Sequence, residues 1–172
     1  MAGRFCGHSD PELNVDGRAQ LTALVEALAG ERFVKVYSSD LRRASSTAQA
    51  LAAVRQLPVE LRPALREIHF GRWEGLCWAE IEQMDGAYAA KWVGAYPDLP
   101  APAGEDLQAF EARVLAEVRQ LGRQSVPIAV VTHAGVMRVV LRHLCGCTES
   151  AAWEQTRSYC CVVRYEPEVE EK

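Results

Sequence analysis

The chain has 172 residues and a mass of 19.0 kDa, which suits one domain with a well-buried core. Its formal net charge of −4 argues against nucleic acid or an anionic membrane as a partner. The sequence holds no apolar run of the roughly 18 residues needed to cross a membrane and no signal-peptide pattern, so we expect a cytoplasmic protein.

The six cysteines do not show the spacing of a zinc site. Cys145 and Cys147 are separated by one residue, and Cys160 and Cys161 are adjacent. Neither pair has the gap of about two to four residues that lets one loop offer two thiolates to a metal. We therefore expect reduced thiols and no metal, and no motif indicates an organic cofactor.

Helical and strand patterns alternate along the chain. In chain order, the pattern predicts a helix over 16–29, a strand over 33–39, a helix over 40–54, an extended segment over 59–61, two short helices over 75–84 and 86–96, a helix over 105–121, a strand over 127–132, a helix over 133–144 and a last strand over 158–167. This alternation predicts one α/β domain over residues 1–172, a three-layer α/β/α sandwich with a mostly parallel sheet. Residues 166–172 form an acidic tail.

Apolar spacing indicates which faces turn inward. The strand over 127–132 is continuously apolar, which is typical of a strand buried on both faces of a parallel sheet. The helices over 16–29 and 105–121 each carry an apolar stripe, formed by Leu21, Leu24, Val25 and Leu28 in the first and by Leu107, Phe110, Val114, Val118 and Leu121 in the second.

Polar residues follow two of the predicted strands. Parallel sheets bind ligands at the carboxyl ends of their strands, where helix N-termini offer free N–H groups. In SSDLRRA, Arg42 and Arg43 lie in the first helical turn, where a positive charge works against the helix dipole. Phosphate binding is one explanation and a solvated helix face is the other. Consecutive side chains point about 100° apart, so both arginines cannot face one ligand.

Two further segments carry candidate catalytic groups. In VVTHAG, His133 follows a buried strand, and Gly135 allows close backbone approach, although a structural histidine is the alternative. In LREIHFGRWEG, Glu67, His69 and Glu74 compete for the role of general acid. A partly buried carboxyl can hold a proton at neutral pH and donate it.

Four ordered segments together resemble the histidine phosphatase superfamily, with its phosphoglycerate-mutase-like fold. They are SSDLRRASSTA, LREIHFGRWEG, PAGEDLQAFEARV and VVTHAGVMRVVL. RFCGHSDPELNVDGRAQ resembles the segment that follows the family's R-H-G motif, so the resemblance runs from about Gly3 to Tyr165. FGRWEGL is similar to the phosphatase branch, which includes α-ribazole phosphatases.

The resemblance implies a phosphohistidine mechanism. A histidine in R-H-G attacks phosphorus, the alcohol leaves with a proton from an acidic side chain, and water releases phosphate. By the same resemblance, Arg43 corresponds to a phosphate-binding arginine, Glu67 to the proton donor and His133 to the second histidine, with a catalytic and phosphate-binding role. Glu105, in the PAGE segment, is expected to anchor the start of its helix.

The chain departs from the family pattern at one motif, because R-H-G is absent from all 172 residues. His8 lies in the segment that follows the motif and is not its replacement, and His69 and His143 match no catalytic position. By alignment of the motifs, the missing histidine falls upstream of Met1, at the end of a central strand that is lost with it. We therefore expect the chain as given to be inactive.

Two explanations stay open. Met1 is an internal methionine taken as the start, or the protein is naturally degenerate. The intact state of the other site residues favours the first. Either way, we expect the fold to lack its first central strand. Because an open sheet edge favours self-association, a homodimer is one expected state.

The expected function is that of a phosphomonoesterase acting on a small-molecule phosphate monoester. A phosphoglycerate mutase is the alternative among enzymes, although this chain is compact where mutases of the family carry insertions. A non-catalytic phosphate-binding or interaction protein is the alternative outside enzymes. The sequence does not indicate which phosphate ester is the substrate.

Overall fold

Three short parallel strands form the sheet in this computed structural model, which describes residues 3–95 and 98–166. β1 (Lys35–Ser38) is the central strand, with β2 (Val59–Leu61) on one side and β3 (Ile128–Val131) on the other. Both pairings are parallel, which confirms the predicted mostly parallel sheet.

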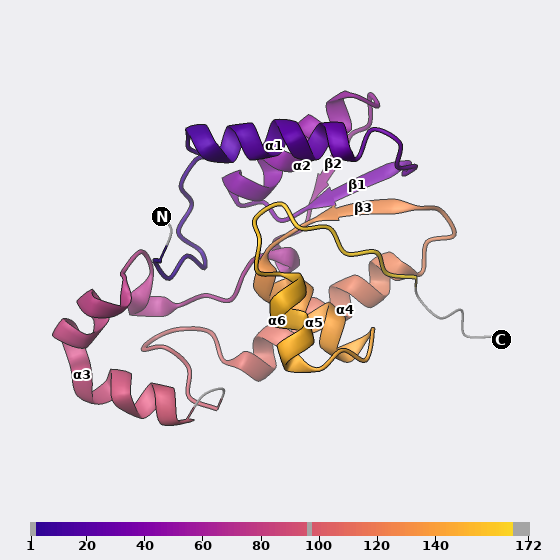
Figure 1. Cartoon of the computed structure of the whole chain (residues 1–172). Helices are drawn as coiled ribbons and strands as arrows, with labels where there is room; N and C mark the ends of the chain where they lie inside the picture. The colour runs from indigo at the N-terminus through magenta and orange to yellow at the C-terminus, as the bar shows by residue number, and fades with distance from the viewer. Residues whose placement is uncertain (1–2, 96–97, 167–172) are drawn as a thin grey trace.

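Helices cover both faces of this sheet. Their bounds are α1 Val15–Ala27, α2 Arg42–Ala53, α4 Leu107–Gly122, α5 Ala134–His143 and α6 Glu149–Gln155. α2 lies against one face with α1 packed on it, while α4 and α5 lie on the other side and α6 packs on α5 (Figure 1). The predicted three-layer α/β/α arrangement is therefore confirmed.

Neighbouring residues of β1 pack into different layers, because successive side chains of a strand point to opposite faces. Val36 packs with Ala48 and Ala52 of α2. Tyr37 packs with the cluster on the other face, which includes Val114 of α4. The sheet thus separates two hydrophobic cores.

The predicted apolar faces of α1 and α4 are buried to different depths. In α4, Phe110, Val114 and Leu121 are buried, and Leu107 and Val118 pack partly buried against the same core. In α1 no residue is buried. The reason is that α1 packs on α2 rather than on the sheet, so its apolar stripe is covered on one side only.

Part of the segment between β2 and α4 forms a second lobe, here called the cap and defined as residues 70–95 and 98–103 (Figure 1). Its long helix α3 (Trp78–Ala95) leaves helical geometry at Asp85, where φ is −157°, so the two predicted short helices are confirmed. Short 3-10 helices precede it at Pro63–Leu65 and Gly71–Trp73. The predicted end of the second helix at residue 96 lies outside the described residues.

An aromatic cluster forms the core of the cap. Trp73 is fully buried at its centre, and the partly buried rings around it belong to Phe5, Phe70, Trp78, Tyr88 and Trp92. Phe5 comes from the beginning of the chain, and the backbone beside it is bonded to the cap through Phe5 N–H to Leu76 O (2.9 Å) and Gly75 N–H to Phe5 O (2.7 Å). The residues near the start of the chain are therefore part of the cap's packing.

The predicted last strand is wrong. Residues 158–166 form turns and an irregular segment, and Cys160 has a left-handed backbone with φ of 56°. A strand needs a hydrogen-bonded neighbour, and within the described residues β3 pairs with β1 alone. The expected deep burial of β3 is also wrong for this reason: its residues are half-buried, and Val130 is 38% exposed. Of the acidic tail, all but Glu166 lies outside the described residues.

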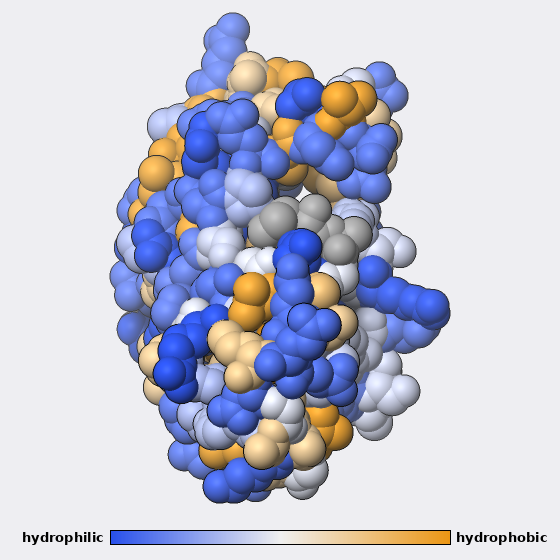
Figure 2. Space-filling view, turned by 90° about the vertical axis from the view of Figure 1, so that its left-hand side faces the viewer, coloured by the Kyte–Doolittle hydropathy of each residue, from blue (hydrophilic) through white to orange (hydrophobic). Residues whose placement is uncertain are grey.

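In the part of the chain that the structure describes, no helix is both long and apolar enough to cross a bilayer. The face shown in Figure 2 is dominated by hydrophilic residues, with hydrophobic ones in small groups among them. Such a mixture is ordinary for the outside of a folded domain.

We predict that Leu65→Ala lowers the free energy of unfolding by about 2–5 kcal/mol, because it opens a cavity in the core between the sheet and α4. Leu65 is 0% exposed. Leu61→Ala is the matched control, since Leu61 is 49% exposed, and we expect a change within about 0.5 kcal/mol. Urea unfolding measures both; equal losses would contradict the assignment of this core.

Candidate active site

Two strand–helix junctions meet at the carboxyl edge of the sheet. The register aligns Ser38 of β1 with Val131 of β3, so the two strands end level with each other. Just beyond them, Ser39 N–H donates to Val131 O (2.9 Å), and the fully buried Ser39 hydroxyl lies 2.9 Å from His133 Nε2. Since α2 begins after Ser39 and α5 after His133, the N-termini of both helices lie at the same edge.

His133 is the N-cap residue of α5 and is buried, with 8% of its surface exposed. Burial, reinforced by the positive charge of Arg43 and by His8 and Arg113, lowers the pKa of His133 from 6.5 to about 3. The ring is therefore neutral at physiological pH. A neutral imidazole offers one N–H donor and one lone pair to a neighbour.

Arg43 projects from the first turn of α2 toward the loop of residues 6–9. Its Nη1 donates to Ser9 O (2.7 Å), and its Nη2 donates to Gly7 O (2.7 Å) and Cys6 O (3.2 Å). Among the described residues no carboxylate pairs with this guanidinium, so its charge is not neutralised by a neighbouring acid. Arg42 instead is exposed and pairs with Glu12, which separates the two arginines as helical geometry requires.

The Glu67 carboxylate lies against the beginning of α5. Its Oε2 accepts from Gly135 N–H (2.9 Å), and its Oε1 accepts from Ile68 N–H (2.9 Å). A Cβ at Gly135 would lie 2.0 Å from Glu67 Oε1, so only glycine admits the carboxyl here. Burial raises the pKa of Glu67 above its ordinary value, against the lowering effect of these hydrogen bonds, and so favours the protonated acid.

The three candidates for a general acid occupy different positions. Glu67 lies beside Gly135 at the junction, close enough to Arg43 for that charge to act on its pKa. His69 contacts the ring of His8, with centroids 4.8 Å apart. Glu74 accepts hydrogen bonds from backbone N–H groups of the loop of residues 6–9 and is not directed at the junction.

Glu105 and Arg113 hold the loop that carries Glu67. Arg113 Nε and Nη2 bind the two oxygens of Glu105 (2.6 and 2.8 Å), and its other hydrogen bonds go to the carbonyls of Ala64, Arg66 and Glu67. The expectation that Glu105 anchors the helix start is wrong: Asp106 is the N-cap of α4 and accepts from the N–H groups at the start of the helix.

Sequence reasoning missed Arg113, Arg66 and the involvement of His8. Arg66 is held by both oxygens of Asp40, which immediately follows the Ser39 junction. His8 Nε2 lies 3.0 Å from Glu67 O, and its charge acts on the pKa of His133. The available signal was the high density of Arg and His in the segments next to the motifs, but the partners of His8 and several partners of Arg113 are backbone carbonyls, which have no sequence signature.

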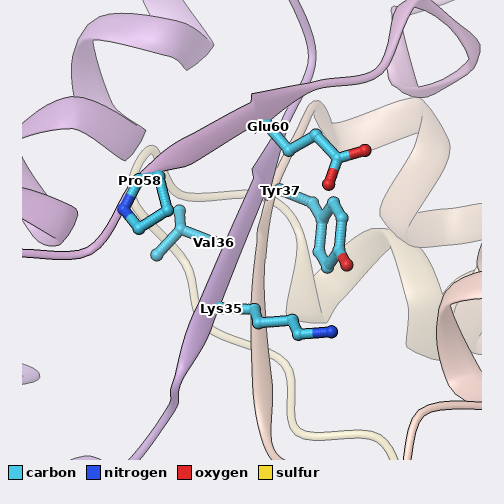
Figure 3. Close-up of a pocket in the computed structure, with 5 residues that line it drawn as sticks. All are labelled: Lys35, Val36, Tyr37, Pro58 and Glu60. Atoms are coloured by element: carbon cyan, nitrogen blue, oxygen red, sulfur yellow. The ribbon is translucent and has the colours of Figure 1, made fainter.

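Other candidate sites are weaker. Among the residues that the structure describes, no three His, Cys, Asp or Glu side chains are grouped to hold a metal ion. A hollow at the strands β1 and β2 is lined by Lys35, Val36, Tyr37, Pro58 and Glu60 (Figure 3). In this view Tyr37, Lys35 and Glu60 point to one side of the strands, and Val36 points to the other. The hollow begins at the amino end of β1 and does not include the junction.

We predict that His133 makes stability depend on pH. An unfolded histidine protonates near 6.5 and folded His133 only near 3, so stability present above about pH 6.5 is lost as the pH falls toward 3. Urea unfolding at about pH 7.5 and 5 should show a smaller loss in His133→Gln than in the wild type. His143→Gln, on the exposed end of α5, is the control. A His133 ring that titrates near 6.5 by NMR would contradict the prediction.

Gly135→Ala should displace the Glu67 carboxyl, because the added Cβ cannot coexist with Oε1. We expect the pKa of Glu67 to fall toward the ordinary glutamate value and stability to drop by about 1–3 kcal/mol. Carbon-detected NMR titration measures the pKa of Glu67, and urea unfolding measures the loss of stability. Gly94→Ala, where a Cβ would meet no atom within 4 Å, is the control. An unchanged Glu67 titration in the Gly135 variant would refute this geometry.

Comparison with known proteins identifies the family. Residues 1–172 match the histidine phosphatase superfamily (branch 1). An adenosylcobalamin/alpha-ribazole phosphatase of Escherichia coli (strain K12) is 33% identical over 153 residues, which cover 88% of this chain and 75% of that protein. A metal-independent phosphoserine phosphatase of Arabidopsis thaliana is 37% identical over 145 residues, covering 81% of this chain and 60% of that protein.

A solved structure gives the same result. The crystal structure of the alpha-ribazole phosphatase from Shigella flexneri has a TM-score of 0.77 to this chain at 29% sequence identity, covering 88% of this chain and 76% of that one. The chain therefore belongs to the histidine phosphatase superfamily, and by family it is a phosphatase.

Proposed function

We propose that the chain provides the phosphate-binding and proton-donating groups of a phosphomonoesterase of the histidine phosphatase type. The observation that carries the proposal is the convergence of Arg43, His133 and Glu67 where α2 and α5 begin. Two helix N-termini and an arginine without a carboxylate partner among the described residues favour a bound anion at this edge. A guanidinium suits phosphoryl oxygens because it can donate two parallel hydrogen bonds.

The three groups have complementary roles in this proposal. Arg43 binds the phosphoryl oxygens, and neutral His133 donates a hydrogen bond to them without adding a charge that burial would oppose. Protonated Glu67 gives its proton to the oxygen of the leaving alcohol, and the resulting carboxylate takes a proton from the attacking water in the second half of the reaction. The raised pKa of Glu67 supports the first of these steps.

The nucleophile is the group that this sequence does not contain. In the proposed mechanism a histidine nitrogen displaces the alcohol from phosphorus, and water then displaces the histidine to release phosphate. R-H-G is absent from the 172 residues, and the structure gives His133 and His8 other contacts. We therefore propose that residues 1–172 by themselves bind phosphate but turn over little or no ester, since losing a nucleophile removes several orders of magnitude of rate.

The substrate class in the proposal is a small-molecule phosphate monoester. The relatives carry different substrate names, α-ribazole phosphatase and phosphoserine phosphatase, and this difference supports the class rather than one ester. The proposal also includes a cytoplasmic location, supported by six free cysteines, and a homodimer, supported by the open edge of β3 in the described chain.

Phosphate binding tests the site directly. Arg43→Ala should weaken the binding of inorganic phosphate by about 10- to 100-fold, the usual cost of losing hydrogen bonds to a charged group. Arg42→Ala removes the same charge one residue away, so it controls for long-range electrostatic attraction. We expect it to change phosphate affinity little. Isothermal titration calorimetry at low ionic strength measures both. Equal losses in the two variants would contradict the assignment of Arg43.

Turnover tests the reaction class. A protein that carries an R-H-G segment ahead of residue 1 should release phosphate from monoesters, and the 172-residue chain assayed beside it should not. Glu67→Gln in the longer protein should lose activity by about 10²–10⁴-fold, the usual contribution of a general acid. Isomerisation of phosphoglycerate faster than phosphate release would instead identify a mutase.

A further inference from the structure

Glu74 holds the loop of residues 6–9 against the beginning of the cap. Its carboxylate accepts five hydrogen bonds, four from backbone N–H groups and one from a hydroxyl. Oε1 accepts from the N–H groups of His8 (2.8 Å) and Phe70 (2.9 Å), and Oε2 accepts from the N–H groups of Ser9 (2.8 Å) and Gly7 (3.2 Å) and from the Ser9 hydroxyl (2.6 Å).

The Glu74 carboxylate is ionised in this contact with the loop. Burial alone would raise the pKa of Glu74, but the hydrogen bonds from Ser9, Phe70 and His8 hold the pKa below its usual value. The group is therefore an ionised acceptor, and hydrogen bonds to an ionised acceptor are stronger than neutral ones. A Cβ at Gly7 would lie 2.4 Å from Glu74 Oε1 and 2.1 Å from the backbone oxygen of Ile68, so the loop fits here only with glycine.

The opposite side of the same loop binds Arg43. The N–H groups of residues 7–9 are directed at Glu74, while the carbonyls of Ser9, Gly7 and Cys6 accept from Nη1 and Nη2 of Arg43. Three consecutive residues thus connect an ionised carboxylate to the guanidinium. The N–H groups of Gly7 and His8 that donate to Glu74 belong to the same peptide groups as the carbonyls of Cys6 and Gly7 that accept from Arg43, so these two hydrogen bonds polarise the carbonyls that bind the guanidinium.

The loop of residues 6–9 fixes the orientation of the Arg43 side chain. A free arginine side chain has several rotatable bonds, and ordering it on binding a ligand costs conformational entropy. Here the carbonyls use Nη1 and Nη2 and fix the plane of the guanidinium, while Nε–H has no hydrogen-bond acceptor among the described residues. Binding through a group that is already ordered avoids this cost at the moment of binding.

We propose that Glu74 is a positioning residue for Arg43: through the backbone of residues 7–9 it holds the guanidinium in the orientation that binds a phosphoryl group. This inference rests on the proposed function of Arg43. Glu74 does not contact the phosphoryl group in this arrangement. Glu74 affects the affinity for phosphate only by orienting Arg43.

A double-mutant cycle on the 172-residue protein tests the proposal, with inorganic phosphate as the probe and calorimetry as the measurement. Glu74→Gln should weaken phosphate binding by about tenfold, because the amide NH₂ faces backbone donors and the charge is lost. In the Arg43→Ala background the same change should alter affinity less than twofold. Glu80→Gln is the matched control: Glu80 also accepts a backbone N–H, from Cys77, and binds Arg4, but in the described structure it forms no hydrogen bond or ion pair with residues 6–9.

The outcomes separate this inference from the proposed function. An unchanged affinity in Glu74→Gln, or an equal loss with and without Arg43, would overturn the positioning role while leaving phosphate binding intact. A wild type that binds no phosphate would overturn the proposed site, and the inference with it. If Glu74→Gln does not fold, Ser9→Ala serves instead, since it removes only the hydrogen bond from the Ser9 hydroxyl to Glu74. A loss of phosphate affinity that occurs only when Arg43 is present supports the proposal. An unchanged phosphate affinity overturns it.

Discussion

The parallel pairing of β1 with β3 is the constraint on which the site depends. The two strands end level, and the hydrogen bond from Ser39 N–H to Val131 O carries that alignment one residue beyond the strands. Ser39 therefore meets His133, and α2 and α5 begin side by side. A shift of one residue in this register would turn every side chain of one strand to the opposite layer, so the junction and the two cores are specified together.

Fixed positive charges surround this junction, and they are held in two ways. Arg66 is held by Asp40, and Arg113 by Glu105, so these two guanidiniums are neutralised by nearby acids. Arg43 is held by backbone carbonyls, which orient a guanidinium without cancelling its charge. The local field at the junction is therefore positive although the whole chain is negatively charged. The low pKa of His133 reflects the same field together with burial.

The sequence was sufficient to predict that one of Arg42 and Arg43 lies near His133, because both segments follow strands of a parallel sheet and such strands end at one edge. The choice of Arg43 over Arg42 came from the family resemblance. The sequence was not sufficient for the last strand, since a strand over 158–167 depends on a neighbour that local pattern does not reveal. Helix α6 was missed although Thr148 is a usual N-cap residue, and its side chain accepts from Ala151 N–H. The contacts of Arg113 and Glu74 were out of reach for a different reason: most of their partners are backbone groups, which are the same for every residue type.

The aromatic core of the cap gives the protein a spectroscopic property. The ring centroids of Trp73 lie 5.2 Å from Trp92 and 6.3 Å from Trp78, so we expect the excited states of these three indoles to couple and to contribute to the near-ultraviolet circular dichroism of the protein. The fourth tryptophan, Trp153, is on α6 beneath the guanidinium of Arg138. The coupled signal thus reports the packing of the cap alone, and loosening of the cap becomes visible while the sheet and its helices remain folded.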